Sequence, residues 1–535
     1  MARYSDSASP DEAVLIETDD FALVYDRQSR AFHKKLWNSS TKSWTTKVAP
    51  YSALVAKDGS TVWAEDSDGK TIASGEAGVD DASVIQSALN SLTAGRKWRE
   101  TVILKGDFEI RNKITLPSHT TLNLSEAYLK LGDSVNDHMF YAEGETNIEI
   151  IGGKLDGNKA NNDTTTYYRL LLFVKCDNLK IRGVEMFNGA YGITIQGDET
   201  GGVIHSNFEV TGCYMHDLDY DGLYYKTYLE NCKAMWNYAK SVRRGFACDD
   251  GCKAVKFAHN VVEDASFWGI EAAGLNAESK DITIKDNALI SAPLSVYAKI
   301  ANVRVISNHF ENCSVQIHVE DDKMPDKEPK QVVFADNTID VGGGRKLIIQ
   351  NAKDVIVANN YIYSSDYYGV DVLGGVNVKI LNSRIKVDKW YSIRVRASGY
   401  RNSSNIEIKD CTTETAGDWD IYVENTDIIT IKRNNILTKG IYLGAGVTNA
   451  EIKNNRGYAT ENSGTATFSG DGTTTQFSIA HGLVSTPTKV LVTPMTADAA
   501  SDFYVTADDT YIYINYLTAP AAGTDNLKFS WFAEV

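Results

Sequence analysis

The sequence predicts an all-β protein whose main part is a parallel β-solenoid, and three observations support this prediction. Two alternating apolar residues followed by a small residue or Asn recur thirteen times between residues 148 and 455, about 25 residues apart. A second segment with period-two alternation follows most copies, as at 192–196, 222–226 and 269–273, so each copy has one apolar and one polar face. Proline is scarce (9), whereas Gly (40) and Tyr (28) are plentiful, which is typical of β-strands joined by tight turns.

Length and charge narrow the class of protein. The chain has 535 residues and a net charge of −16, which argues against nucleic acid or an anionic membrane as a partner. It holds no run of 18 apolar residues, so we expect no membrane insertion. The start, Met1 to Asp6, has no apolar segment, so no signal peptide is visible.

The residue that ends each copy of the first segment is expected to form a stack from coil to coil. Seven of the thirteen are Asn, whose amide can bond its counterpart one coil away and which tolerates left-handed turn geometry: Asn260, Asn287, Asn308, Asn337, Asn360, Asn434 and Asn455. Three copies end in Cys213, Cys232 and Cys411, which we interpret as small buried residues in the same stack.

The periodicity divides the chain into three parts. Residues 1–75 are expected to form a small β module, 76–460 the solenoid, and 465–535 a β-sandwich-like domain where the period is lost. The segment from Asp80 to Leu92 has acidic residues followed by apolar residues at helical spacing. A helix there would cover the open end of the solenoid.

The same segment carries a resemblance to a known family. Asp80-Asp81, the helix with Gln86, Val102-Ile103-Leu104 and Leu116-Pro117-Ser118 resemble the opening of pectate-lyase-superfamily right-handed β-helices, including phage tailspikes and capsule depolymerases. The resemblance implies a single-stranded right-handed parallel β-helix, a polysaccharide ligand, and an extracellular or virion-associated location. The C-terminal part is similar to small domains of tail-fibre proteins, which implies a homotrimer or receptor binding; a cap on the solenoid is the alternative.

The polar faces of the second segments are expected to line up in two columns along the solenoid. Aromatic rings beside charges suit a polymer of sugar rings, because rings stack on pyranose faces and charges bond hydroxyl or acidic groups. The residues predicted to bind substrate are Tyr224, Lys226, Glu320, Asp371, Arg396 and Tyr422.

One pair of carboxylates in this grid predicts glycoside hydrolysis. Asp249 and Glu271 are expected on adjacent strands, two residues out of step, which gives roughly 8 Å between backbone positions. A separation near this value suits inverting hydrolysis, and one near 5 Å would suit retention. Asp250 and Asp221 lie close in sequence, and crowded carboxylates raise one another's pKa, as a general acid requires.

Two alternatives remain open. Lys299, His318, Tyr297 and Arg394 are the residue types of a polysaccharide lyase, in which a cation neutralises a uronate and a base removes a proton. The nearby acidic residues Glu320, Asp371 and Glu424 would repel such a substrate. A non-catalytic glycan-binding spike or adhesin is the third possibility.

No cofactor is predicted. Asp217, Asp219 and Asp221 alternate and could surround Ca²⁺, but Tyr220 and Gly222 break the spacing of a known calcium loop, and a solvated acidic turn is the preferred interpretation. The leading hypothesis is therefore a polysaccharide depolymerase, with hydrolysis favoured over elimination.

Overall fold

The computed structural model describes residues 51–200, 202–321, 327–340, 342 and 346–535, together with the backbone of four strands within residues 12–46. Residues 1–11, on which the prediction about a signal peptide rests, lie outside the described residues. Within the described parts of the chain, no helix is both long and apolar enough to cross a membrane.

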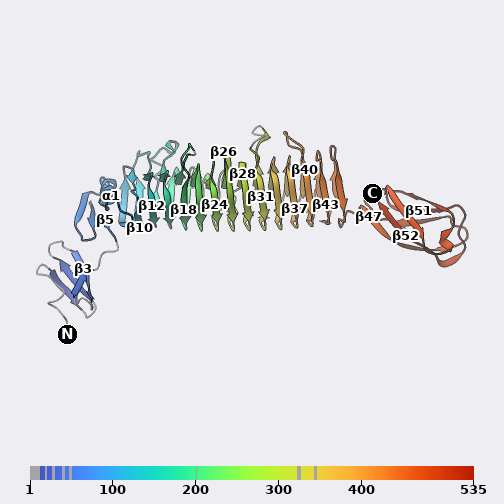
Figure 1. Ribbon diagram of the computed structural model, residues 1–535, viewed down its shortest axis with the longest axis horizontal. Coiled ribbons are helices and arrows are strands. Elements are labelled where there is room, and N and C mark those ends of the chain that lie inside the picture. Colours follow the sequence, from blue (N-terminus) through green and yellow to red (C-terminus); the bar gives the residue numbers. More distant parts are fainter. Residues whose placement is uncertain are drawn as a thin grey trace. The chain divides into compact units, whose positions relative to one another are not determined.

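The structure confirms the predicted fold class, an all-β parallel solenoid of about fourteen turns. The chain divides into two compact units, residues 1–292 and 293–535. In each unit, corresponding strands of successive turns pair in parallel. Figure 1 labels strands of one such row, among them the alternate strands β12, β18 and β24 in the first unit and β31, β37 and β43 in the second.

The first unit begins with antiparallel strands. The first four pair in the order β1-β2-β3-β4; they are β1 (Glu12–Glu17), β2 (Phe21–Asp26), β3 (Ala31–Asn38) and β4 (Ser43–Thr46). They are followed by β5 (Ala53–Asp58), β6 (Thr61–Asp66), β7 (Thr71–Glu76) and helix α1 (Asp81–Asn90). We expected β5–β7 in a separate module, but β5 pairs in parallel with β8 of the solenoid, so these strands extend the solenoid sheet.

Each solenoid turn has a first, a middle and a last strand. In the first unit the first strands are β8 (Glu100–Ile110), β10 (Thr120–Leu131), β12 (Thr146–Ile151), β15 (Asp177–Arg182), β18 (His205–Thr211), β21 (Leu229–Met235), β24 (Lys253–Ala258) and the end of β26 (Trp268–Lys285). The middle strands are β13 (Lys154–Asp156), β16 (Glu185–Gly189), β19 (Tyr214–Leu218), β22 (Tyr238–Lys240), β25 (Val261–Glu263) and β27 (Ala288–Ile290). The last strands are β9 (Ile114–Thr115), β11 (Phe140–Glu143), β14 (Arg169–Val174), β17 (Tyr191–Gln196), β20 (Asp221–Lys226), β23 (Arg244–Cys248) and the start of β26, with a 3₁₀ turn η1 (Thr164–Thr166) before β14.

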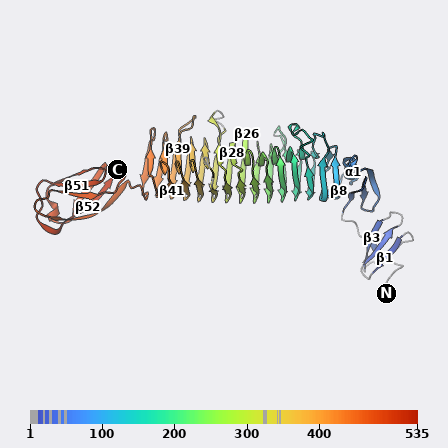
Figure 2. The same ribbon diagram turned by 180° about the vertical axis from the view of Figure 1, so that it is seen from behind.

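The second unit repeats this plan, and Figure 2 shows its strands and those of the first unit from behind. Its first strands are the end of β28 (Leu294–Ile306), β31 (Lys330–Ala335), β34 (Lys353–Ala358), β37 (Val376–Leu381), β40 (Ser404–Lys409), β43 (Ile429–Lys432) and β46 (Ala450–Lys453). The middle strands are β29 (His309–Glu311), β32 (Thr338–Asp340), β35 (Tyr361–Ser364), β38 (Arg384–Val387), β41 (Thr412–Thr415) and β44 (Asn435–Ile436). The last strands are the start of β28, β30 (Val315–His318), β33 (Leu347–Gln350), β36 (Val370–Leu373), β39 (Ile393–Arg396), β42 (Ile421–Val423) and β45 (Ile441–Leu443).

The sequence indicated only the first and last strands of each turn. The middle strands of the turns from β13 to β44 have between two and five residues, too few to establish an alternating pattern. Each sends one or two side chains inward, as Val262 and Ile339 do. The turn is therefore three-sided, with inward side chains from all three strands filling the core.

The predicted Asn stack is present in both units. Asn260 donates from Nδ2 to the carbonyl of Ala234 (2.9 Å) and to Oδ1 of Asn287 (3.0 Å), and it accepts from the amide of Asn237 (3.0 Å). In the second unit Asn337 bonds Asn360 in the same way (3.2 Å). The predicted alignment was wrong in one turn, because Asn237 and not Cys232 is the stack residue there; Cys232 lies on β21 in the core.

The left-handed geometry belongs to the residue before each stacked Asn and not to the Asn itself. His259 (φ 56°), Asp286 (φ 54°) and Asp336 (φ 56°) show this arrangement. The chain thus bends at the residue before the Asn, and the side-chain amide of the Asn bonds the Asn residues of the neighbouring turns. All seven cysteines are buried with free thiols. Cys213 and Cys411 lie in the stack as predicted, whereas Cys232 is buried outside it.

Helix α1 forms as expected and packs against β5, β6, β7, β8 and β9. Its two leading carboxylates do not cap it: Asp80 accepts from the amide of Glu76 (2.9 Å), and Asp81 accepts from Lys57 Nζ (2.8 Å) and the amide of Glu109 (2.7 Å). Asp81 therefore ties the helix to the first turns of the solenoid.

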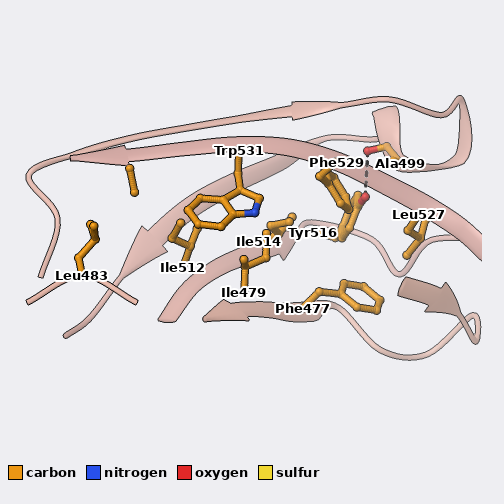
Figure 3. Close-up of a cluster of buried hydrophobic side chains, with 11 residues drawn as sticks. Phe477, Ile479, Leu483, Ala499, Ile512, Ile514, Tyr516, Leu527, Phe529 and Trp531 are labelled. Carbon is orange, nitrogen blue, oxygen red and sulfur yellow. Dashed lines mark hydrogen bonds between the residues drawn. The ribbon is translucent and has the colours of Figure 1, made fainter. Parts of the chain in front are cut away.

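The C-terminal part consists of two small antiparallel sheets, as the prediction of a β-sandwich-like domain required. One has the order β47-β52-β49 and the other β48-β51-β50. The strands are β47 (Glu461–Gly470), β48 (Gln476–Ala480), β49 (Lys489–Pro494), β50 (Phe503–Ala507), β51 (Tyr511–Tyr516) and β52 (Gly523–Glu534), with η3 (Asp498–Ala500). Their buried side chains, among them Phe477, Ile514 and Trp531, gather between the strands (Figure 3). Tyr516 lies in this core and donates its hydroxyl to the carbonyl of Ala499 (2.8 Å).

Candidate active site

The candidate site lies on the last strands β20, β23 and β26 of the first unit. Tyr224 of β20 pairs with Ala247 of β23, and Ala247 pairs with Glu271 of β26. Asp249 directly follows β23 and is two residues beyond Ala247. Asp249 and Glu271 are therefore one turn and two residues apart, as the spacing in the sequence predicts.

Glycines bring these three strands close together just where the site begins. A side chain on Gly222 would put its Cβ 2.8 Å from the carbonyl oxygen of Gly245, and one on Gly245 would come within 2.5 Å of the carbonyl oxygen of Gly269. Such contacts are shorter than van der Waals separation, so only glycine fits. The residues before these glycines, Asp221 and Arg244, are thereby held one turn apart in register.

Arg244 joins two of the candidate carboxylates. Its Nε and Nη2 atoms donate to Oδ1 (2.8 Å) and Oδ2 (2.6 Å) of Asp221, and its Nη1 atom donates to Oε2 of Glu271. Asp221 is 0% exposed and Glu271 is 8% exposed. We missed Arg244 at the sequence level. The sequence feature that could have identified Arg244 is its position one turn after Asp221 and directly before Gly245.

Asp249 has a different partner. The hydroxyl of Tyr224 donates to its Oδ2 atom (2.7 Å), and the Arg244 guanidinium lies 4.7 Å from the centroid of the Tyr224 ring. The small side chain of Ala247, between Tyr224 and Glu271 in the column, leaves room for this arrangement. Of the two carboxylates, Glu271 is therefore paired with the cation Arg244, and Asp249 is hydrogen-bonded to the neutral phenol of Tyr224.

Burial shifts the protonation equilibria of the site. It raises the pKa of Asp249, against the effects of the hydrogen bond from Tyr224 and the charge of Arg244. It also raises the pKa of Glu271, against the attraction and hydrogen bond of Arg244. Burial and the charge of Asp249 raise the pKa of Tyr224, so its phenol remains a donor. Carboxyl groups with raised pKa values are suited to proton transfer near neutral pH.

The two neighbouring acidic candidates have structural partners. Asp221 is enclosed by the bidentate contact with Arg244. Asp250 accepts from the backbone amide (2.8 Å) and side-chain amide (2.8 Å) of Asn276 and anchors the segment that follows Glu271. Asp221 and Asp250 are thus held by neighbouring side chains and backbone, while Asp249 and Glu271 remain the carboxylates of the candidate site. Lys226, predicted to bind substrate, donates to Glu199 (2.8 Å) and Gln196 (3.3 Å).

Aromatic rings lie at the starts of the neighbouring strands. Tyr191 and Tyr220 stack with centroids 4.7 Å apart, and Tyr167 lies 5.1 Å from Tyr220. The guanidinium of Arg169 lies 4.7 Å from the centroid of the Tyr191 ring. Tyr191 and Asp221 begin adjacent last strands, so this group borders the carboxylates along the solenoid.

The columns predicted for the second unit differ from the observed register. We expected one column to run from Tyr297 through His318 and Ile348 to Asp371 and Arg394. His318 does pair with Tyr297, but its next partner is Gln350 and not Ile348. Every later residue of these columns is therefore displaced by two positions relative to Tyr297 and His318. A shift of two residues preserves the alternation of inward and outward side chains, so the apolar pattern could not reveal it.

This register separates the predicted lyase residues. Tyr297 and His318 are in ring contact at 5.0 Å, and the Tyr297 hydroxyl donates to Glu320 (2.7 Å). Lys299 lies beyond Ala298, which has left-handed geometry (φ 58°). Arg394 is three turns away from His318 and in the other column.

Asp371 and Arg394 form a buried pair, which corrects their predicted roles as a substrate ligand and a uronate-binding cation. Arg394 donates from Nε and Nη2 to Asp371 (2.8 and 2.7 Å) and from Nη1 to the Tyr368 hydroxyl (2.9 Å). Asp371 is buried completely. Tyr422 donates to Glu424 (2.9 Å), and the Nε atom of Arg396 is buried without a hydrogen-bond partner among the described residues.

The acidic residues considered for Ca²⁺ take three different partners. Asp217 contacts His216 Nδ1 (2.7 Å), Asp219 contacts Lys159 Nζ (3.1 Å), and Asp221 pairs with Arg244. In the described portion of the chain, no three His, Cys, Asp or Glu side chains are grouped so that they could hold a metal ion.

Comparisons with known proteins identify the family. The family model described as "Right handed beta helix region" matches residues 169–326, 267–414 and 327–480, which together exceed half of the chain. The chain belongs to this right-handed β-helix family. The family adds the handedness to the parallel topology that the strand pairing shows.

Individual similarities are weaker. The chain is 22% identical over 418 residues to a pre-neck appendage protein of Bacillus phage B103, covering 71% of this chain and 45% of that protein. The chain thus spans about half the length of the curated relative it matches. Among solved structures, a mutant tailspike protein of E. coli bacteriophage HK620 gives a TM-score of 0.48 at 13% identity, covering 88% of this chain and 92% of that one. The A-module of the mannuronan C-5 epimerase AlgE6 of Azotobacter vinelandii gives 0.39 at 16% identity, covering 71% and 96%.

Arg244 provides a test of the buried charge network. We expect Arg244→Gln to lower the free energy of unfolding by about 3–5 kcal/mol, because Asp221 stays buried without its counter-ion. Arg433→Gln is the matched control, since Arg433 makes the same bidentate contact with Asp410 (2.8 and 2.7 Å) in an exposed position and should cost at most about 1 kcal/mol. Urea denaturation followed by circular dichroism measures both, and equal losses in the two variants would contradict the assignment.

Proposed function

We propose that the protein is a polysaccharide depolymerase that hydrolyses glycosidic bonds. The observation that carries this proposal is the pair Asp249 and Glu271, on one outward face, one turn and two residues apart and with different partners. Their backbone positions are roughly 8 Å apart, from a turn spacing of about 4.8 Å and two residues of about 3.3 Å each. Carboxyl groups at a similar separation would leave room for a water molecule between carboxylate and sugar, as inverting hydrolysis requires.

The partners of the two carboxylates suggest their roles. Glu271 is in direct contact with Arg244, which favours its ionised form and suits a general base. Burial raises the pKa of both carboxyl groups, but Asp249 is bonded to a neutral phenol and not to a cation, so it is the one that suits a general acid. Asp249 gives its proton to the glycosidic oxygen as the bond from the anomeric carbon to that oxygen breaks. Glu271 takes a proton from water, and the oxygen of that water forms the new bond to the anomeric carbon.

The surroundings support a polymeric sugar as substrate. Tyr167, Tyr191 and Tyr220 lie along the solenoid beside the carboxylates, and aromatic rings pack well against the C–H faces of pyranoses. The relative in Bacillus phage B103 is named as an appendage protein, which supports a virion-borne or extracellular place of action.

Two further proposals concern the alternatives and the assembly. The lyase is less favoured because Arg394 is engaged by Asp371 and lies away from His318; a non-catalytic glycan-binding spike is the outcome if no polymer is cleaved.

We also propose the homotrimer that the resemblance implied. It is supported by exposed apolar side chains on the C-terminal sheets and their loops, namely Leu491, Met495, Tyr504 and Leu517. A solution mass of 58.9 kDa, that of one chain, would exclude the trimer.

Cleavage is tested on a panel of neutral and acidic polysaccharides with a reducing-sugar assay and mass spectrometry. We expect new reducing ends without the ultraviolet absorbance of unsaturated uronates. Asp249→Asn and Glu271→Gln should each lower the rate by about 10²–10⁴-fold. Asp410→Asn, in an exposed pair remote in sequence, should retain full activity. Undiminished cleavage in both active-site variants would exclude this site, and absorbance by unsaturated products would establish elimination.

The pH dependence of cleavage tests the role of Asp249. The bond from Tyr224 favours the ionised form of Asp249 and so lowers its pKa. Tyr224→Phe removes this bond, so the pKa of Asp249 rises and the basic limb of the rate profile moves to higher pH. A hydrogen bond to a charged group is worth about 1.5 kcal/mol or more, which corresponds to a displacement of about one pH unit. A displacement to lower pH would contradict the assignment of Asp249 as the general acid.

A further inference from the structure

A second concentration of aromatic side chains lies in the second unit, on its last strands and on the segments that directly precede them. We call it the aromatic wall, and it consists of Tyr367, Tyr368, Trp390, Tyr391, Trp419, Tyr422 and Tyr442. These residues belong to four successive turns, those of β36, β39, β42 and β45. Three of these rings, Tyr367, Trp390 and Tyr442, are exposed, whereas Tyr368 is buried; exposed aromatic rings grouped on one surface commonly mark a binding site.

Four of the rings form a continuous stack. The centroid distances are 5.5 Å from Tyr368 to Tyr391, 4.7 Å from Tyr391 to Tyr422 and 5.1 Å from Tyr422 to Tyr442, and neighbouring planes differ by 16° or less. The stack follows the direction in which the turns repeat, about 4.8 Å apart. The inner rings cover one another's faces, so this stack supports the wall but has few free faces for a ligand.

Tyr367 and Trp390 are oriented differently. The plane of Tyr367 makes 84° with Tyr368, and that of Trp390 makes 80° with Tyr391. Both planes therefore run along the repeat direction. The two rings are within 13° of parallel, with centroids 6.1 Å apart. One turn accounts for about 4.8 Å of the 6.1 Å between the two centroids. The rings are therefore displaced mainly along the repeat direction, in which both planes run, and form a platform of two adjacent, slightly offset rings.

This platform faces solvent and is held in place. Tyr367 is 40% exposed and Trp390 is 39% exposed. Thr415 donates its hydroxyl to the Trp390 carbonyl, and Lys389 pairs with Asp366 (2.9 Å), which links the two turns that carry the rings. At Gly417 a side chain would come within 1.9 Å of the Lys389 carbonyl, so the next turn packs directly on this one. A platform fixed in advance loses little entropy when a ligand binds.

The charge of the surrounding turns selects the kind of ligand. Residues 365–368, 388–391 and 416–419 include three carboxylates, Asp366, Asp388 and Asp418, and one cation, Lys389, while Lys346 of the preceding turn is buried. Lys389 is already paired with Asp366. An acidic polymer would be repelled, whereas a neutral sugar could stack on the rings and bond the carboxylates through its hydroxyl groups.

We propose that Tyr367 and Trp390 form a non-catalytic binding site for neutral pyranose glycans. The site belongs to the second unit, whereas Asp249 and Glu271 belong to the first. It does not depend on cleavage: it would hold a neutral segment of a polymer whether or not the other site acts on that polymer.

Affinity electrophoresis of the full-length chain tests this site. Gels contain dextran, pullulan, laminarin or yeast mannan as neutral glycans, and alginate or polygalacturonate as acidic ones. The chain carries Asp249→Asn so that no glycan is cleaved during the run. We expect at least one neutral glycan to retard the protein, and Trp390→Ala and Tyr367→Ala each to weaken that retardation about tenfold or more.

Trp98→Ala is the matched control, because Trp98 is 59% exposed and lies in the first unit; it should leave retardation unchanged. Circular dichroism verifies that each variant is folded. Retardation by no neutral glycan, retardation by acidic glycans alone, or equal losses in the Trp390 and Trp98 variants would overturn the proposal. Retardation that persists with Asp249→Asn and is lost with Trp390→Ala would support it even if no glycan is hydrolysed by the unaltered protein.

Discussion

The parallel hydrogen bonding of each strand to its counterpart one turn later is the interaction on which the rest of the structure depends. It turns a sequence separation of 20 to 32 residues into a spatial separation of one strand spacing, as the pairs Asp221 with Arg244 and Ala247 with Glu271 show. A slip of one residue would send every outward side chain into the core. The Asn stack and the close-packed glycines at 222 and 245 oppose such a slip, so they also fix the geometry of the carboxylates.

The same repeat gives two Asp–Arg pairs with different surroundings. In both units an Arg holds the Asp of the preceding turn through two hydrogen bonds and lies over a tyrosine ring. The third contact of Arg394 is a tyrosine hydroxyl, whereas that of Arg244 is the carboxylate of Glu271. Burying an ion pair contributes little net stability. In the first unit, however, the pair places a cation against one carboxylate and leaves Asp249 with a neutral partner, which is the asymmetry that acid–base catalysis needs.

The sequence was sufficient for the fold because alternation and a constant repeat length are properties of local composition. It predicted the stacking of Asn260 on Asn287 and the adjacency of Asp249 and Glu271, since both follow from counting residues per turn. It could not place His318 relative to Ile348, because the turn from His318 to Gln350 is 32 residues long whereas that from Tyr297 to His318 is 21, and a two-residue shift leaves the alternation intact. It also missed Arg244, whose importance lies in a side chain that reaches across turns in both directions, and the perpendicular rings of Tyr367 and Trp390, whose orientation depends on turn geometry.

The stereochemistry of the first product tests the central claim most directly, because it reports the separation of the two carboxylates during the reaction. Proton NMR of the anomeric region, recorded within the first minutes of cleavage and before mutarotation, distinguishes the two outcomes. The arrangement of Asp249 and Glu271 predicts a product of inverted anomeric configuration. A product with retained configuration would require carboxylates close enough for one to attack the sugar, and it would contradict the account.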